Sequence, residues 1–294
     1  MKYIIIGASS SIGSEMYSFL QKKKIKVLGT YFKKKQPQLV KFDVRKDDIK
    51  NFFYEINSND IVIIFSAITN PQEVLKKKQN SKKINVFGTK RLINDLSRIG
   101  CKIIFISSVE VFDGKKGAYT ESSKTKPLSL YGKHKNIIEK FLINEIKKNY
   151  TIIRLCWTIC MKKKSRDVVS LTYNTIKKKN AKMSYDNYFN ISHSEDVCKG
   201  IYKISKTNID LVHLTSKEKI SRFDLAMMIK RYSKNEKKMF FEKIRFKEFP
   251  YPERRARLNF LSSKINQKNL GIKYRSIKRT VLQKLKILDY EKCN

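Results

Sequence analysis

The chain has 294 residues, of which 41% are hydrophobic, and its 65 Lys and Arg against 26 Asp and Glu give a net charge of +39. This length and apolar content allow one domain plus a smaller lobe, and they exclude a disordered chain. No apolar run reaches the roughly 18 residues of a membrane span. The lysines occur in scattered triplets among abundant Ile, Asn, Tyr and Phe, all with A/T-rich codons, which indicates compositional drift and disfavours nucleic acid as the main partner.

The first unit predicts a phosphate-binding turn. An apolar strand over residues 2–6 leads into a turn with two glycines and a helix, and a second strand follows at residues 25–30. The N–H groups of such a turn and of the helix N-terminus can hold a pyrophosphate. Serines stand where the middle glycine of a dinucleotide loop is expected. The residues expected to bind a cofactor here are Gly7, Ser9, Ser10, Ser11, Ile12 and Gly13.

The end of the second strand distinguishes two cofactors. NAD binders usually place a carboxylate there for the ribose hydroxyls, whereas a basic residue suits a 2′-phosphate. Here Tyr31 and Lys33 follow the strand without an acid. We therefore favour NADP(H), with NAD(H) as the alternative.

Two further strands, at residues 39–42 and 61–65, end in residues suited to the same cofactor. Asp43 and Val44 are expected beside the adenine, and a turn of small residues can approach the cofactor closely. A long helical region follows at residues 72–99. The remaining cofactor-binding residues expected here are Ser66, Ala67, Thr69 and Asn85.

The candidate catalytic residues follow a strand expected at residues 101–106. Ser107 and Ser108 lie at its carboxyl end, where open α/β sheets bind ligands, so Ser107 is expected at the cofactor. Tyr131 and Lys135 are four residues apart in a helical pattern and therefore share one face. We expect the ammonium to lower the pKa of the phenol and the Ser108 hydroxyl to hold a carbonyl oxygen. This order of motifs suits carbonyl reduction by hydride transfer.

The alternation of strands and helices predicts an α/β fold with a Rossmann-like, doubly wound parallel sheet. After a strand at residues 151–155 the alternation weakens. We assign residues 1–157 to the nucleotide-binding domain and residues 158–294 to a smaller C-terminal α/β substrate lobe. Segments within about 188–215 are expected to return to the first domain.

The histidines and cysteines give no metal-ligand spacing and no CxxC motif, so we expect no metal and a reduced, cytoplasmic protein. His134 is expected on the surface of the Tyr131 helix. His193 precedes a helix that Ser194 is expected to cap, and it is a candidate substrate contact. The sequence also allows a homodimer.

The chain resembles the extended short-chain dehydrogenase/reductase superfamily and, within it, the dTDP-4-dehydrorhamnose reductase family. The resemblance is carried by Val111–Gly117, Tyr119–Glu121 and Tyr131–Lys135, and it is supported by Arg154–Trp157 and Ser192–Val197. It implies a sugar-nucleotide substrate whose 4-keto group is reduced with NAD(P)H.

The resemblance also implies roles for individual residues. Tyr131 would protonate the carbonyl oxygen, and Lys135 would bind the nicotinamide ribose. Trp157 would line the sugar pocket, and Arg254 or Arg255 would hold the substrate diphosphate, because a guanidinium suits phosphate.

One departure from the family leaves alternatives open. Ser108 is followed by Val109 and Glu110, all three being expected at the substrate, where related 4,6-dehydratases read Thr-Asp-Glu. Val109 cannot donate a proton, so elimination of water should fail. Glu110 matches the dehydratase base, so epimerisation or decarboxylation stays possible. The alternative is that Glu110 is a loop residue that faces solvent. A non-catalytic, cofactor-binding regulatory subunit is the remaining alternative.

Overall fold

The computed structural model describes residues 1–33, 35–53, 55–263 and 270–290. Its main body is a parallel sheet of seven strands with the order β10-β6-β5-β4-β1-β2-β3. The strands of this sheet are β1 (Tyr3–Ile6), β2 (Val27–Tyr31), β3 (Val40–Lys41), β4 (Ile61–Ile64), β5 (Lys102–Ser108), β6 (Tyr150–Leu155) and β10 (Leu211–Leu214).

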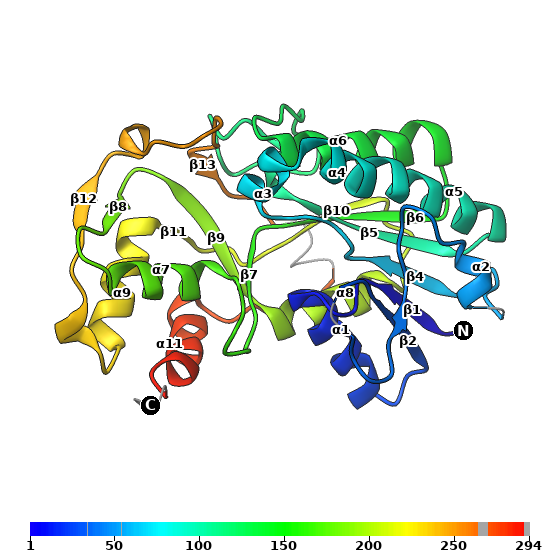
Figure 1. The fold of residues 1–294 in the computed structure, drawn as a ribbon, viewed down its shortest axis with the longest axis horizontal. Helices are drawn as coiled ribbons and strands as arrows, with labels where there is room; N and C mark the ends of the chain where they lie inside the picture. The colour runs from blue at the N-terminus through cyan, green and yellow to red at the C-terminus, as the bar shows by residue number, and fades with distance from the viewer. Residues whose placement is uncertain (34, 54, 264–269, 291–294) are drawn as a thin grey trace.

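Helices cover both faces of this sheet (Figure 1). One layer contains α1 (Ser11–Lys22) and α8 (Ser194–Ile204). The other contains α3 (Pro71–Lys76), α4 (Lys78–Lys82), α5 (Thr89–Ile99) and α6 (Leu130–Phe141), with α2 (Ile49–Phe52) at the edge. The doubly wound α/β fold expected from the sequence is confirmed.

Alternation along β1 shows why both faces are covered. Tyr3 and Ile5 pack in the cluster that contains Met16 of α1, whereas Ile4 and Ile6 pack in the cluster formed with α5 and α6. Successive residues of a strand point to opposite faces, so an apolar run without polar alternation must be buried on both sides.

Several boundaries differ from those expected. β5 continues through Ser107 and Ser108, because both pair with β6, so the serines end the strand instead of following it. The region expected as one long helix is divided into α3, α4, a π-helical stretch η1 (Lys83–Gly88) and α5. His193, not Ser194, caps α8: its Nδ1 accepts a hydrogen bond from the Glu195 amide at 3.1 Å.

The smaller lobe is built on two further sheets and its own apolar cluster. A four-stranded sheet contains β7 (Trp157–Ile159), β9 (Tyr188–His193), β11 (Lys219–Ser221) and β13 (Leu258–Asn259), and a two-stranded sheet contains β8 (Lys182–Ser184) and β12 (Glu242–Ile244). Its helices are α7 (Val168–Ile176), α9 (Arg222–Tyr232) and α11 (Ile277–Leu288). Of the segment expected to return to the first domain, β10 lies in the main sheet and β9 in the lobe sheet.

Candidate active site

The three candidate catalytic side chains meet where β5 ends against α6. Ser129 caps α6 by accepting a hydrogen bond from the Gly132 amide at 3.1 Å, which starts the helix immediately before Tyr131. Lys135 lies one turn later, is 5% exposed, and donates through Nζ to the Ile106 carbonyl at 2.6 Å. The Ser108 side chain lies near the Tyr131 phenol, whose pKa it lowers.

The pKa values of this group differ from the expectation. Burial raises the pKa of Tyr131 well above its ordinary 10, and the nearby Glu110 carboxylate raises it further, while the Ser108 side chain lowers it. Burial lowers the pKa of Lys135 to about 7, against the opposing effect of Glu139. The expected lowering of the phenol pKa by Lys135 is therefore wrong, since the Lys135 ammonium bonds to the backbone of β5 instead.

Glu110 connects the start of α6 to β13 of the smaller lobe. Its Oε2 accepts from Ser129 Oγ at 3.0 Å, and its Oε1 accepts from Asn259 Nδ2 of β13 at 2.8 Å. A Cβ at Gly132 would lie 2.0 Å from the Glu110 carbonyl, so only glycine lets α6 approach this turn. Glu110 thus does not face solvent alone, because both carboxylate oxygens have partners.

A buried polar network connects the end of β5 to α6, β6 and β10. Ser107 Oγ donates to Glu139 Oε1 at 2.5 Å, and Arg154 forms an ion pair with Glu139 at 2.7 Å. Arg154 Nη1 also lies 3.3 Å from His213 Nε2. The Ser107 hydroxyl therefore bonds within the protein interior.

His134 is 3% exposed, so its expected place on the surface of α6 is wrong. Neighbouring helices bury α6 on that side.

A cavity of about 610 Å³ lies at the carboxyl ends of β1, β2 and β4. Gly7 has a φ of +88°, and a Cβ there would lie 2.9 Å from the Ser66 amide, so glycine is needed for this turn. The cavity size suits a nucleotide, and the adjoining N-terminus of α1 suits its phosphates. The expected cofactor residues that line it are Gly7, Ser9, Ser10, Tyr31, Lys33, Asp43, Val44, Ser66, Ala67 and Thr69.

Some of the expected cofactor residues do not line the cavity but support the segments that do. The Gly13 amide donates to Ser10 Oγ at 3.2 Å, which uses that hydroxyl to cap α1. Asn85 accepts from the Ile68 amide at 2.8 Å and donates to its carbonyl at 2.9 Å, so it shapes the turn after β4. Ser11 and Ile12 lie in the first turn of α1.

The part of the cavity lined by Asp43 and Val44 contains an arginine that was not among the expected site residues. Arg45 forms an ion pair with Asp43 at 2.6 Å, and its guanidinium lies 5.2 Å from the ring centre of Phe32. The Asp43 carboxylate is therefore occupied by Arg45, which holds the pKa of Asp43 below its usual value. Arg45 follows the expected Asp43-Val44 pair directly, so the signal was present in the sequence.

The residues expected at the substrate lie on several lobe elements. Trp157 begins β7 and pairs with Ile191 of β9. His193 is 5% exposed, and burial together with Arg275 lowers its pKa to about 4, so it is neutral at pH 7. Arg255 is half-buried, with its guanidinium 5.6 Å from the Tyr251 ring, whereas Arg254 is exposed.

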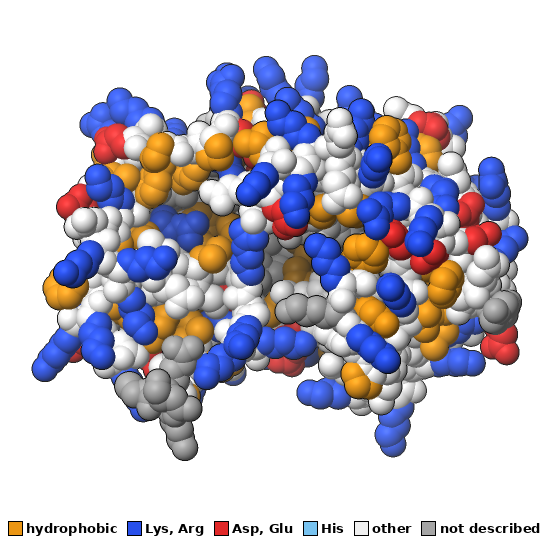
Figure 2. Space-filling model, viewed as in Figure 1, with side chains coloured by type: hydrophobic (Ala, Val, Ile, Leu, Met, Phe, Trp, Pro, Cys, Tyr) orange, Lys and Arg blue, Asp and Glu red, His pale blue; other side chains and the backbone are white. Residues whose placement is uncertain are grey.

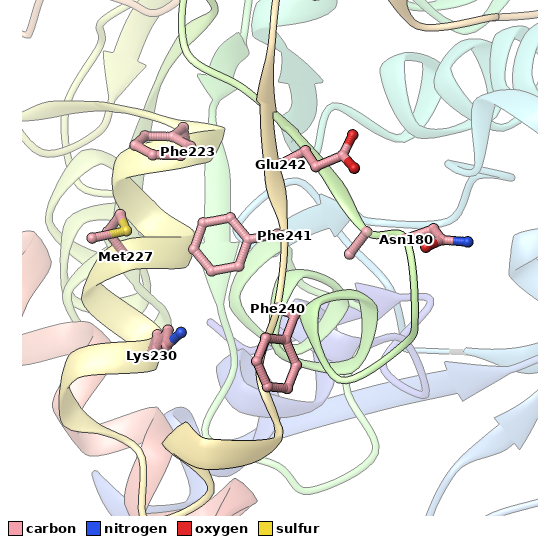
Figure 3. Close-up of a pocket in the computed structure, with 8 residues that line it drawn as sticks. Asn180, Phe223, Met227, Lys230, Phe240, Phe241 and Glu242 are labelled. Carbon is pink, nitrogen blue, oxygen red and sulfur yellow. The ribbon is translucent and has the colours of Figure 1, made fainter.

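The lobe has a second cavity, of about 440 Å³, between α9 and the chain leading into β12 (Figure 3). Phe223 and Met227 of α9 face Phe241 across it. It contains none of the residues expected at the site.

The described residues contain neither a membrane-spanning helix nor a metal-binding cluster. No helix there is long and apolar enough to cross a membrane. No group of three or more His, Cys, Asp or Glu side chains in that part of the chain is arranged to hold a metal ion.

Known proteins resemble this chain over its whole length. The family model for the RmlD substrate binding domain matches residues 1–289. A dTDP-4-dehydrorhamnose reductase from Clostridium acetobutylicum superposes with a TM-score of 0.85 at 26% identity, covering 98% of this chain and 99% of that one. A dTDP-4-dehydrorhamnose reductase from Bacillus anthracis, solved in complex with NADP, gives a TM-score of 0.81 at 21% identity, covering 96% and 98%.

Curated relatives match a shorter stretch. Methionine adenosyltransferase 2 subunit beta from Rattus norvegicus is 26% identical over 142 residues, which is 48% of this chain and 42% of the relative. The matched stretch therefore covers less than half of the length of that curated relative.

Proposed function

The chain belongs to the RmlD substrate binding domain family, as its motifs indicated, and from this premise we propose that it reduces the 4-keto group of a nucleotide-linked deoxysugar with NADPH. The observation that carries the proposal is the meeting of Ser108, Tyr131 and Lys135 at the end of β5. Relatives described as dTDP-4-dehydrorhamnose reductases support the substrate class.

The cavity at the carboxyl ends of β1, β2 and β4 fits the cofactor. Gly7, Ser9 and Ser10 would hold its phosphates, and Tyr31 and Lys33 would lie at its ribose. The missing carboxylate after β2 and the cations there favour NADPH over NADH. When bound, this cofactor supplies the hydride for carbonyl reduction.

The residues of the chain handle the proton. The Tyr131 phenol is protonated at pH 7, so it has a proton to give to the carbonyl oxygen of the substrate, although burial raises its pKa and makes it a weaker acid. Ser108 lies near the same phenol and orients that oxygen. Lys135 Nζ lies 5.9 Å from the centre of the Tyr131 ring, and its hydrogen bond to the Ile106 carbonyl fixes it beside the phenol, where it would bind the nicotinamide ribose.

Glu110 acts in this proposal by positioning other groups. Each of its oxygens accepts a hydrogen bond, from Ser129 and from Asn259, so the carboxylate holds α6 against β13. This arrangement disfavours the epimerase or decarboxylase alternative, in which Glu110 would remove a proton from the sugar.

The test is a panel of sugar nucleotides mixed with the reduced cofactor. We expect a 4-keto deoxysugar nucleotide to consume NADPH in a one-to-one ratio with product, whereas an epimerase would recycle the cofactor. If no 4-keto sugar nucleotide causes net oxidation of NADPH, the reductase proposal is wrong.

A second candidate is a nucleotide-binding subunit of a larger enzyme. The match to a protein named as a subunit of methionine adenosyltransferase 2 favours it. In that case the chain would bind NADPH and co-purify with a catalytic subunit, and Tyr131→Phe would leave the activity of the complex unchanged. A loss of activity in that variant would exclude this candidate.

A further inference from the structure

A loop of the substrate lobe, residues 160–167 between β7 and α7, reaches the nucleotide-binding domain. Lys162 Nζ donates to Ser14 Oγ in the first turn of α1 at 2.7 Å. In the same loop, Arg166 lines the cavity that also contains Gly7, Ser9 and Ser10. This loop therefore lies beside the phosphate-binding turn although more than a hundred residues separate the two in the sequence.

A fully buried lysine of α11 fixes the shape of this loop. Lys284 is 0% exposed and donates through Nζ to the Cys160 carbonyl at 2.8 Å, the Lys162 carbonyl at 2.6 Å and Ser165 Oγ at 2.6 Å. It also pairs with Asp167 at 3.2 Å. Isolated buried ammonium groups are costly, so such a lysine persists where several oxygens surround it.

Arg166 is held between two buried neighbours but is itself exposed. Ser165 is 9% exposed and Asp167 is 2% exposed, and Asp167 caps α7 by accepting from the Ser170 amide at 2.9 Å. Among the described residues no carboxylate pairs with Arg166. Its backbone is therefore fixed while its guanidinium is free to bind an anion in the cavity.

The phosphate-binding turn has no positively charged side chain of its own. Residues 7–14 contain no Lys or Arg, and the Ser10 hydroxyl is used to cap α1. The other described cations that line the cavity, Lys33 and Arg45, follow β2 and β3, and Arg45 is neutralised by Asp43. Of the described cations that line the cavity, Arg166 is the one from the smaller lobe, whereas Lys162 of the same loop bonds to Ser14.

We propose that Arg166 of the substrate lobe binds the pyrophosphate of the nicotinamide cofactor, in the place of a phosphate contact that this turn lacks. This inference rests on the proposed function, since it requires a dinucleotide in the cavity. It makes the loop of residues 160–167 a link through which the substrate lobe contributes to cofactor binding.

The experiment compares the affinities of the full chain for NADPH and NADH, measured by nucleotide fluorescence titration. Arg166→Ala is expected to weaken both about tenfold, since one charge-assisted contact to a group common to both is lost. Arg166→Lys should keep part of the affinity. Lys164→Ala, in the same exposed loop but not lining the cavity, is the matched control and should bind as the wild type does.

The outcomes separate the inference from the function. Unchanged affinity in Arg166→Ala, with a melting temperature equal to that of the wild type without nucleotide, would overturn the role of Arg166 and leave the proposed function standing. A loss confined to NADPH would overturn it as well, because it would assign Arg166 to the 2′-phosphate. If the wild type bound neither nucleotide, the proposed function would fail together with the inference.

Discussion

At the scale of single residues, the surroundings of Tyr131 define the direction of its chemistry. Burial raises the pKa of this phenol, so it holds its proton at neutral pH and can donate it, and it then needs a partner that restores the proton. Ser108 and Lys135 are the side chains that the fold brings to it, and they come from two different elements.

Replacing Tyr131 tests this role. Tyr131→Phe removes the proton donor, so we expect the rate of carbonyl reduction to fall by about 10²- to 10⁴-fold while the affinity for NADPH is unchanged. Single-turnover oxidation of NADPH measures the first quantity and fluorescence titration the second. Tyr173→Phe, which removes another buried phenol that bonds to Asp289 in the lobe, should leave the rate intact. Equal rates for wild type and Tyr131→Phe would contradict the assignment.

The lowered pKa of Lys135 predicts a dependence of stability on pH. The folded state releases the proton near pH 7, whereas the unfolded chain holds it to about pH 10.4. Between these values the unfolded state binds more protons, so the free energy of unfolding rises with pH by up to about 1.4 kcal/mol per unit. Urea unfolding of the wild type and of Lys135→Met at several pH values isolates this contribution. A difference between the two proteins that stays constant from about pH 7 to pH 10 would show that the pKa is not lowered.

At the scale of elements, the ion pair between Arg154 of β6 and Glu139 of α6 connects the helix of Tyr131 and Lys135 to the main sheet. The two side chains are 3% and 1% exposed, so neither charge is screened by water. Ser107 and His213 extend the same network to β5 and β10. Removing one partner leaves a buried charge, whereas removing both leaves an apolar gap.

The corresponding variants should show this difference. Arg154→Met is expected to lower the free energy of unfolding by about 3–5 kcal/mol, and the double variant with Glu139→Met should recover much of that loss. Arg98→Met breaks an exposed ion pair with Asp95 and should cost at most about 1 kcal/mol. Chemical denaturation of wild type, Arg154→Met, Glu139→Met, the double variant and Arg98→Met measures these values. Additive losses in the double variant would argue against a direct interaction of the pair.

At the scale of the whole molecule, the excess of positive charge is spread over the surface. Figure 2 shows Lys and Arg side chains over both lobes of the visible face, without a single stripe. A dispersed charge attracts any polyanion, but it provides no groove that follows a nucleic acid backbone. It can also raise the local concentration of anionic sugar nucleotides.

This distribution predicts weak and salt-dependent binding to DNA. We expect filter binding of duplex DNA at low salt to disappear at about 0.2 M salt, because the contacts are only electrostatic. Binding of NADPH should persist there, since a cavity encloses it. Saturable binding of one duplex sequence at about 0.2 M salt would instead support a nucleic-acid function.

The local pattern of the sequence carried the main elements of the fold. Residues such as Ile4, Ile5 and Ile6 form an apolar run that only a strand covered on both faces can bury, and the glycine turn after it marks the first crossover. α11 begins directly after Ser276, whose side chain caps it, so a local signal in the sequence marks its start. The predicted end of β5 was too early, because Ser107 and Ser108 belong to the strand only through their pairing with β6.

By itself, the sequence determined the parallel α/β fold, the family and the order of Ser108, Tyr131 and Lys135, since each depends on spacing along the chain. Only the tertiary structure decided the burial of His134, the raised pKa of Tyr131, the two partners of Glu110 and the arrival of Arg166 at the phosphate-binding turn. These properties depend on desolvation and charge from residues far away in the sequence, and periodicity along the chain carries no information about such neighbours.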